Sequence, residues 1–458
     1  MKPSTSAVFS LLLAVSCNDP EPCQSRNSGS AEPTPQDPPA SCTPVPIPER
    51  FQQERAACTF KQGASAATTL GVDRATALAI PIRHVIILMK ENRSFDHLLG
   101  KLHEQGQPAT LPVPTGFGNL DAAGAFVSPF RATTTCIPQD PPHQWDDMHA
   151  AVNGSKMDGF VSAAARSTGT DGHFTMSYYT QADLPFYYWL ASTWALSDNH
   201  FASLRTGTDP NRYFLMFGTN AGVRSTGGGK PDASTPSLFT LLERAGYTWG
   251  SYGSGTPLSG ALGWNHDSPH CYCLRDLLDQ LDNGTLPNVV FVDGRESLQD
   301  DHPDADLQTG EAWLQRIYLH AINSPQWPRM ALFWTYDEGG GFADHVPPPN
   351  AACAPGLSPG DDAFVELGPR VPLVLISPYA KPHYVSHTVH DHTAITRFIE
   401  TIFDLPALGG RDANSTALLD MFDFSCAPPM LSPPRARAPG ADGCQRVSKM
   451  NTDVGSGM

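Results

Sequence analysis

Asp337 and Glu338 are the two side chains of this sequence whose placement most needs a chemical reason. They follow the apolar run 331–336, which suits a buried strand, and they precede three glycines. Adjacent buried carboxylates repel each other, so a positive charge is expected beside them. A divalent cation would supply it, because hard cations bind oxygen ligands. An exposed turn is the alternative, since water would then screen the pair.

Residues of the same chemical kind follow a second apolar run. Glu91 and Asn92 come directly after the β-branched segment 83–89. Thr208 lies in a turn that contains Gly and Pro, ahead of a predicted helix, where backbone N–H groups are available to an anion. A cation beside its hydroxyl would lower the hydroxyl pKa and turn the oxygen into a nucleophile. Each position, taken singly, also fits an ordinary turn or helix end.

Strands and helices alternate along the chain and would position these residues. The apolar runs typical of buried parallel strands are 83–89, 288–294, 331–337 and 371–379. The helical patterns between them are 235–246, 311–324 and 391–404. The alternation predicts an α/β domain with a mostly parallel central sheet and helices on both faces. Ligands of such sheets gather beyond the carboxyl ends of the strands, where the polar clusters stand.

Composition and charge narrow the class of partner. The chain has 458 residues, of which 40% are hydrophobic, so it can bury a large core. Its net charge of -16 argues against nucleic acid as a partner, because that binding needs clustered Lys and Arg. A phosphate ester remains possible as a substrate if a bound metal supplies the local positive charge.

The two ends of the chain predict export and a folded middle. Residues 1–17 have the pattern of a signal peptide that ends at a lipobox-like cysteine, Cys17, with plain secretion as the alternative. Ten cysteines agree with export. We expect a Pro/Ser-rich tether over 18–75, one folded domain over 76–425 and a Pro-rich tail over 426–458. A lipid on Cys17 would anchor the chain to a membrane of the cell envelope.

Seven segments occur in the order known from one family. They are "HVIILMKENRSFDHLLG", "HQWDDMHAAVNGSKMDGF", "LSDNHFASLRTGTDPNRYFLMFGT", "GTLPNVVFVDG", "DDHPDADLQTGEAWL", "YDEGGGFADHVPPP" and "VHDHTAITRFIE". Between residues 80 and 405 the chain resembles the bacterial phosphoesterase family, which includes phospholipases C and acid phosphatases. The resemblance implies an alkaline-phosphatase-like α/β core and a phosphoesterase catalytic domain over 76–425.

The resemblance also implies a metal site and a nucleophile. Glu91 and Asn92 match the family's first metal-binding pair, and Asp337 and Glu338 match its second. Thr208 matches the nucleophile, which also touches the metal. Thr206 and Gly207 stand where the family commonly has Gly-Pro, which changes the turn but keeps the hydroxyl. One or more divalent cations of unknown identity are therefore expected.

Several histidines and polar residues match positions near the phosphate. His143 is expected to contact phosphate oxygens, and His345 to protonate the leaving group. Weaker candidates for substrate contacts are Asn211, Arg212, His302, Asp344 and His392. For Asn211 and Arg212 the alternative is a brace for the following helix, and for His392 it is a supporting or helix-capping role.

The function implied is a metal-dependent, phospholipase C-like hydrolysis of phosphoesters through a phosphothreonine on Thr208. An acid phosphatase acting on monoesters is the alternative within the family. Two further alternatives are a surface-binding lipoprotein that has lost the chemistry and a related sulfatase or phosphonate hydrolase. The aromatic-rich segment 176–194 could form a lipid approach or could belong to the core.

Overall fold

The computed structural model of the chain describes residues 45, 47, 49–253, 269–357 and 360–441. The predicted signal peptide with Cys17, the tether over 18–44 and the last part of the tail, 442–458, lie outside these residues. Within the described ranges, no helix is both long enough and apolar enough to cross a membrane.

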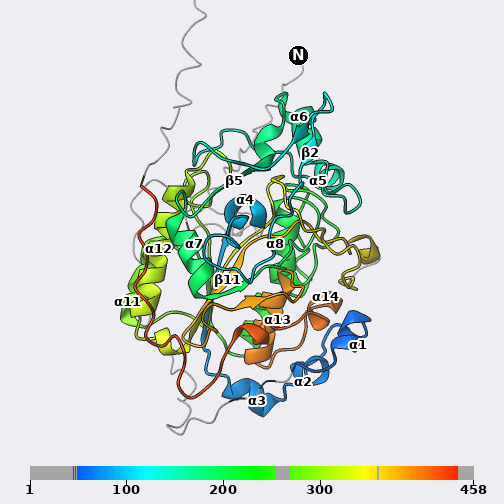
Figure 1. Ribbon diagram of the computed structural model, residues 1–458. Coiled ribbons are helices and arrows are strands. Elements are labelled where there is room, and N and C mark those ends of the chain that lie inside the picture. Colours follow the sequence, from blue (N-terminus) through cyan, green and yellow to red (C-terminus); the bar gives the residue numbers. More distant parts are fainter. Residues whose placement is uncertain (1–44, 46, 48, 254–268, 358–359, 442–458) are drawn as a thin grey trace, which may run out of the picture.

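The centre of the molecule is an eight-stranded sheet with the strand order β12-β6-β11-β10-β1-β9-β7-β8 (Figure 1). Its strands are β1 His84–Lys90, β6 Ala195–Ser197, β7 Trp249–Tyr252, β8 Cys271–Tyr272, β9 Val289–Val292, β10 Met330–Tyr336, β11 Leu373–Ile376 and β12 Val385–Ser386. Two small sheets pair β2 Asn119–Leu120 with β3 Phe126–Val127, and β4 Phe130–Arg131 with β5 Ser177–Tyr178. Most neighbours in the large sheet are parallel, which confirms the predicted fold class.

Strands β1 and β10 form the buried centre of the sheet. All seven residues of each strand are buried, because apolar side chains cover both faces. The two strands are parallel and in register along their whole length, from the pair His84 and Met330 to the pair Lys90 and Tyr336. The residues that follow them, Glu91 and Asp337, therefore emerge side by side at one edge of the sheet.

Strand β11 differs from the prediction in direction. The run 371–379 was expected to be parallel to the other strands, but β11 is antiparallel to both β10 and β6. An apolar run reports burial on both faces and does not report strand direction. The reversal has a consequence for the site, because the start of β11, next to Arg370, lies at the edge where β1 and β10 end.

Helices cover both faces of the sheet. Figure 1 shows α7, α11 and α12 on one side and α8 and α13 on the other. The predicted helical segments correspond to α9, α12 and α13. The helices beyond the N-terminal segment are α4 Phe95–Leu99, α5 Trp145–Val152, α6 Phe160–Thr168, α7 Pro185–Thr193, α8 Thr208–Phe217, α9 Leu238–Arg244, α11 Leu274–Asn283, α12 Leu307–Asn323, α13 Thr393–Ile402 and α14 Gly410–Ala413.

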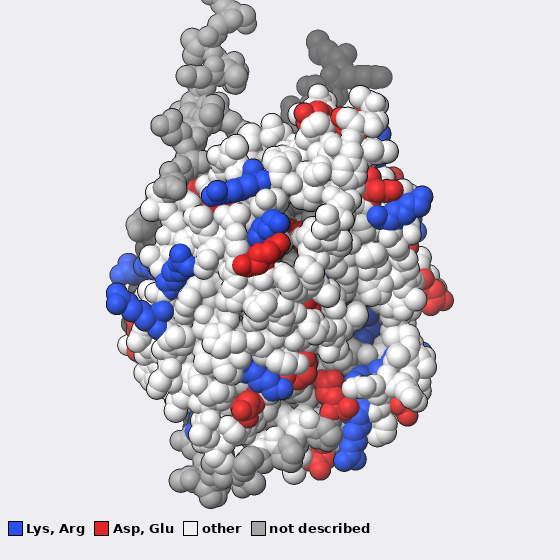
Figure 2. All heavy atoms as spheres, viewed as in Figure 1, with Lys and Arg blue, Asp and Glu red and all other residues white. Residues whose placement is uncertain are grey.

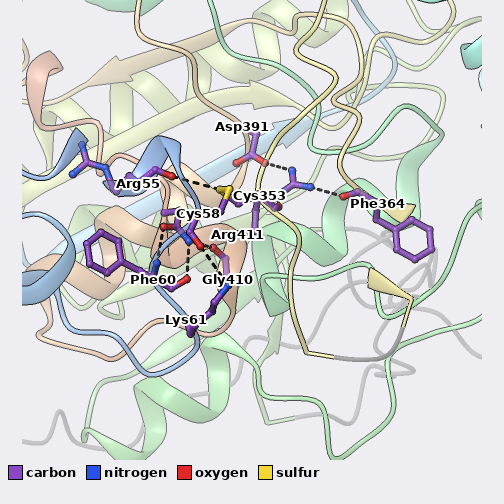
Figure 3. The surroundings of a disulfide bond; sticks show 10 residues. Arg55, Cys58, Phe60, Lys61, Cys353, Phe364, Asp391, Gly410 and Arg411 are labelled. Carbon is purple, nitrogen blue, oxygen red and sulfur yellow. Dashed lines mark hydrogen bonds and ion pairs between the residues drawn. A yellow bond between two sulfur atoms is a disulfide. The ribbon is translucent and has the colours of Figure 1, made fainter. Parts of the chain in front are cut away.

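The segment before β1 packs on the domain, in contrast to the tether predicted up to residue 75. It forms three short helices, α1 Gln52–Ala56, α2 Ala66–Thr69 and α3 Arg74–Ala79, and Leu70 and Val72 are buried. A disulfide joins Cys58 to Cys353 (Figure 3). The segment has few large apolar residues, so its composition resembles that of a linker although the disulfide and short helices hold it in place.

Loss of this disulfide is expected to destabilise the fold. The bridge spans a sequence separation of 295 residues, so it removes much conformational freedom from the unfolded chain. Replacing Cys58 and Cys353 together by serine should lower the free energy of unfolding by about 2–4 kcal/mol. Denaturant unfolding of the variant and the wild type measures the difference, and equal midpoints with equal slopes would contradict the prediction.

The described part of the C-terminal tail also packs on the domain. Met430 is buried, Cys426 is disulfide-bonded, and the backbone N–H of Gly440 donates to Glu311 of α12 at 2.8 Å. The tail thus lies against α12 as far as residue 440.

Candidate active site

The two predicted metal-binding pairs meet at the carboxyl ends of β1 and β10. The backbone N–H of Asn92 donates to Oδ1 of Asp337 at 3.1 Å, and the N–H of Arg93 donates to the carbonyl of Glu338 at 3.1 Å. Glu91, Asn92, Asp337 and Glu338 are each at most 5% exposed. The alternative of an exposed turn for the acidic pair therefore does not hold.

The glycines after Glu338 let the two strand ends approach closely. Gly340 has φ +62°, and a Cβ there would lie 2.1 Å from the carbonyl oxygen of Asn92, which no side chain could tolerate. Asn92 itself has φ +61°, in the left-handed region that Asn tolerates better than most residues. The N–H of Gly340 donates to Oε2 of Glu338 at 2.7 Å, which fixes that carboxylate.

Glu91, Asn92, Asp337 and Glu338 form a first cluster of side chains. This cluster carries more negative charge than the neighbouring groups stabilise. Burial raises the pKa of Glu338 well above its ordinary value, and the neighbouring Asp337 raises it further. Burial and Asp337 also raise the pKa of Glu91 well above its ordinary value, although Arg212 opposes the shift. These shifts mean that ionised carboxylates at this position need an additional positive charge.

Three oxygens of the cluster fit a bound cation. Oδ1 of Asn92, Oδ2 of Asp337 and Oε1 of Glu338 are buried and have no hydrogen-bond partner among the described residues. Buried polar atoms are normally hydrogen-bonded, so a group of orphaned acceptors needs an explanation. Carboxylate and amide oxygens in a dry site are the donor set that a divalent cation takes, so the residues present fit such an ion.

Arg212 supplies part of the positive charge that the acidic pair requires. Its guanidinium contacts Glu91 at 3.0 Å and Asp293 at 2.5 Å, and Nε lies 3.6 Å from Oδ2 of Asp337. The side chain is 3% exposed. These contacts support the brace alternative for Arg212. Asp293, directly after β9, was not singled out from the sequence, although its position at a strand end could have identified it.

Thr208 begins α8, and the same helix carries Arg212 one turn later. Residues four apart share a helix face, so Thr208 lies on the side of α8 that faces the carboxylates. Thr208 is 5% exposed. The loop before it is held by Asn211, which accepts from the N–H of Leu204 at 2.8 Å and donates to the carbonyl of Gly207 at 2.9 Å. Both ends of the Asn211 amide are thus occupied, which supports its brace alternative.

His143 and His302 lie beside this cluster. Nε2 of His143 is 3.4 Å from Nδ2 of Asn92 and 3.9 Å from Oε1 of Glu338, and Nδ1 is 2.7 Å from the carbonyl of Pro141. Because that carbonyl can only accept, Nδ1 carries the proton and Nε2 faces the cluster. The ring of His302 is 6.4 Å from the ring of His143. His143 is thus placed to contact a ligand at the cluster, and His302 lies next to it.

His345 belongs to a second buried cluster, built around Arg370. Nδ1 of His345 is 2.7 Å from Oδ2 of Asp96, whose other oxygen accepts from Arg370 at 2.8 Å. Burial alone would raise the pKa of Asp96, but Arg370 and His345 together bring it below its ordinary value. An ionised Asp96 fixes the orientation of the imidazole, a role that the sequence did not indicate.

The carboxylate of Asp344 also belongs to this second cluster, where it accepts hydrogen bonds from protein groups. Its carboxylate accepts from Nε of Arg370 at 2.9 Å and from the N–H of Asp96 at 3.2 Å. Ligand atoms of Asp96, Asp344 and His345 lie within 4.8 Å of one another, as in some metal sites. Arg370 already contributes the positive charge there, so the geometry favours an ion-pair network. The contacts of Asp344 therefore do not support the substrate contact that was expected of it.

His392 holds together two segments that carry the site. One ring nitrogen lies 2.9 Å from the carbonyl of Tyr336, the last residue of β10, and the other lies 3.1 Å from the hydroxyl of Ser203. The ring is fully buried. His392 thus links the strand that ends just before Asp337 to the loop that leads to Thr208, in agreement with the supporting alternative.

Comparisons with known proteins agree with this arrangement. The model of the Phosphoesterase family matches residues 82–406. The chain is similar to "Phospholipase C A" from Mycobacterium tuberculosis, with 32% identity over 78% of this chain and 79% of that protein. "Non-specific phospholipase C3" from Arabidopsis thaliana is 30% identical over 71% of this chain and 70% of that protein.

Another relative is considerably longer. "Non-hemolytic phospholipase C" from Burkholderia pseudomallei is 30% identical over 74% of this chain, but the match spans only 57% of that protein.

Among solved structures, a protein in the alkaline phosphatase superfamily from Vibrio parahaemolyticus matches 74% of this chain and 69% of its own at 9% identity and a TM-score of 0.35. That score is too low to support an argument of its own.

The family match covers both predicted metal-binding pairs, Thr208 and the histidines around them. Together with the relatives, it supports a hydrolase that acts on phosphoester bonds. The resemblance inferred from seven short segments is confirmed, and the chain belongs to the Phosphoesterase family.

Proposed function

We propose that this chain is a cation-dependent phosphoesterase of the phospholipase C type that forms a phosphothreonine on Thr208. The observation that carries the proposal is the group of three orphaned oxygens, on Asn92, Asp337 and Glu338, at the sheet edge that α8 faces. A divalent cation held by Glu91, Asn92, Thr208, Asp337 and Glu338 would add positive charge beside the Thr208 hydroxyl and the phosphoryl oxygens.

In the first step, the Thr208 hydroxyl gives its proton to water and its oxygen bonds to phosphorus as the bond from phosphorus to the alcohol oxygen breaks. The start of α8 presents free backbone N–H groups to the phosphoryl oxygens, because the first turn of a helix has no partners for them. His143, whose Nε2 faces the cluster, would donate from Nε2 to the same oxygens when its ring carries a proton on both nitrogens. The departing alcohol oxygen takes a proton from His345, which Asp96 orients.

In the second step, water attacks the phosphothreonine and the bond from phosphorus to the Thr208 oxygen breaks. The neutral His345 that remains after the first step takes a proton of the attacking water, and the Thr208 oxygen takes a proton from bulk water as it leaves. The products are the free alcohol and the phosphorylated head group, and the chain returns to its initial state.

The role of His345 predicts a dependence on the leaving group. His345→Gln should slow release of an aliphatic alcohol by about 10²-fold or more, because that alcohol needs a proton to depart. The same variant should retain more than about a tenth of the rate on a nitrophenyl ester, whose phenolate leaves without help. Asp96→Asn should show the same selectivity. Equal losses on both substrates would contradict the assignment of His345.

The substrate class proposed is a phosphodiester of a phospholipid, in line with the names of the relatives. Hydrolysis of nitrophenyl phosphorylcholine and nitrophenyl phosphate, with and without chelator, tests this proposal against an acid phosphatase. Faster chelator-sensitive cleavage of the choline diester supports the phospholipase. Faster cleavage of the monoester supports the phosphatase, and no cleavage of either supports a binding protein that has lost the chemistry.

Export and lipid anchoring at Cys17 are part of the same proposal. They are supported by the signal-like segment 1–17 and by disulfides in the folded domain, which form in oxidising compartments. Metabolic labelling with a radioactive fatty acid tests the anchor. Incorporation that disappears in Cys17→Ser supports a lipoprotein, and a secreted chain without label supports plain secretion.

A further inference from the structure

We propose that the segment 111–130 docks onto a zwitterionic phospholipid layer and delivers lipid from it to the site around His345. This inference rests on the proposed function and names the physical form of the substrate. Nine large apolar residues are exposed in the described chain, and four of them fall within these twenty positions. They form what we call the apolar rim: Leu111, Leu120, Phe126 and Phe130.

The hairpin β2–β3 carries large apolar side chains on its exposed face. Asn119 pairs with Val127, and both side chains are buried. The next pair, Leu120 and Phe126, must point to the opposite face, where they are 56% and 54% exposed. An outward face normally carries polar residues, so two large apolar side chains placed side by side there indicate a partner.

The hairpin is held firmly in this orientation. The side chain of Asn119 accepts from the N–H of Phe160 at 2.7 Å and donates to the carbonyl of Met157 at 3.0 Å. At the tip, Asp121 accepts from the N–H groups of Ala123 and Ala125 at 2.9 and 2.8 Å. These hydrogen bonds fix the hairpin with its apolar side chains exposed. The carboxylate of Asp121 at the tip accepts hydrogen bonds from the backbone of its own turn.

The apolar rim continues inward to the second cluster of the site. The ring of Phe117 meets the ring of His345 edge-on, with centroids 6.1 Å apart. Beside it, a narrow crevice is lined mainly by apolar side chains and reaches Asp96. Its apolar walls are Val113, Phe117, Pro129, Met176 and Ala343. The crevice has room for only about 30 Å³, so the acyl chains would stay in the lipid layer against the apolar rim while the glycerol end of the ester approaches His345.

Charge around the rim favours a zwitterionic layer over an anionic one. Two cations near the rim are already paired, Lys101 with Glu104 at 3.4 Å and Arg131 with Asp183 at 2.6 Å. Figure 2 shows mainly uncharged side chains over β2, with groups of both charge signs over α4 and at the margins of this face. The chain also has a net charge of -16, which opposes binding to anionic lipid. Apolar insertion is therefore the main attraction, and salt should affect it little.

The test compares the full chain, produced with its disulfides, with a double variant, Leu120→Ser with Phe126→Ser. Partition onto sucrose-loaded phosphatidylcholine vesicles is measured by sedimentation, and hydrolysis of the same vesicles is followed in parallel. We expect the double variant to lose at least about tenfold in both. Its cleavage of soluble nitrophenyl phosphorylcholine should stay within about twofold of wild type, because neither residue touches the site.

A matched control replaces Leu319 of α12, which is 40% exposed, by serine and should bind vesicles like wild type. Unchanged vesicle binding by the double variant, or no binding by the wild type, would overturn the proposal. A wild-type dimer that the double variant converts to monomer would identify the rim as a self-association surface instead. Failure of the proposed function is separate, because it would abolish cleavage of the soluble diester while vesicle binding could still be measured.

Discussion

Thr208→Ala is expected to lower kcat/KM by at least about 10³-fold on every phosphoester that the wild type cleaves. The substitution removes the oxygen that bonds to phosphorus, and no other hydroxyl lies on the same face of α8 near Arg212. Affinity for a divalent cation should fall only in part, because four of the five proposed ligands remain. Steady-state kinetics and calorimetric titration with Mg²⁺, Mn²⁺, Ca²⁺ or Zn²⁺ measure the two effects.

Thr208→Ser is the matched control for this prediction. It keeps the hydroxyl and removes only a methyl group, so it should retain a measurable fraction of the wild-type rate and restore most of what alanine loses. Thermal unfolding of both variants should match the wild type within a few degrees, since position 208 is the first residue of its helix. Activity that survives in Thr208→Ala would reject Thr208 as the nucleophile.

Removal of divalent cations is expected to abolish activity, with a loss of more than about 10³-fold, and to destabilise the fold. The reason is the charge of the first cluster, where Glu91, Asp337 and Glu338 repel one another and Arg212 offsets part of that charge. Re-addition of the native cation should restore both activity and melting temperature. Asp337→Asn should bind the cation more weakly and should resist chelator-induced destabilisation better than wild type.

The stabilisation by the cation should depend on pH with a definite sign. In the chelated chain, burial holds the pKa of Glu338 and of Glu91 well above 4.5, so the folded state binds more protons than the unfolded state. Stability contributed by these groups is therefore complete below pH 4.5 and is lost as pH rises toward the folded pKa. A bound cation neutralises the ionised carboxylates, so the loaded protein does not lose this stability as pH rises.

The melting temperatures of loaded and chelated protein, compared from about pH 5 to about pH 8, test that sign. The difference between them should grow as pH rises. Buried histidines such as His97 and His200, whose pKa values are lowered by burial, shift both curves alike and cancel in the difference. A difference that is constant or shrinks with pH would contradict the assignment of the carboxylates as ligands.

The central elements of the fold could be predicted because their signals are local. The runs of β1 and β10 are long, β-branched or aromatic, and end in carboxylates, so both the strands and the ligand pairs could be identified from adjacent letters. Helices α12 and α13 follow from their apolar periodicity. The direction of β11 could not be predicted, because it depends on the path of the chain between strands. Strands of two or three residues, such as β6 and β12, are too short to show a pattern.

The contacts that organise the site could not be predicted, because they join segments far apart in the sequence. Arg212 meets Glu91 and Asp293, and Arg370 meets Asp96, across separations of 81 to 274 residues. The sequence shows that each residue is charged but does not show which charges are buried together. For the same reason Asn211 and His392 matched positions near a substrate, whereas their side chains hold the loop and strand that carry the site.

Capture of the phosphorylated chain tests the central claim most directly. The full chain is mixed with excess substrate, stopped with acid within one turnover, and digested with trypsin, which cuts after Arg205 and Arg212 to release peptide 206–212. We expect one added phosphoryl group on Thr208, located by fragmentation, and none in Thr208→Ala. Rapid turnover without this phosphopeptide, or a phosphoryl group on a histidine, would contradict it.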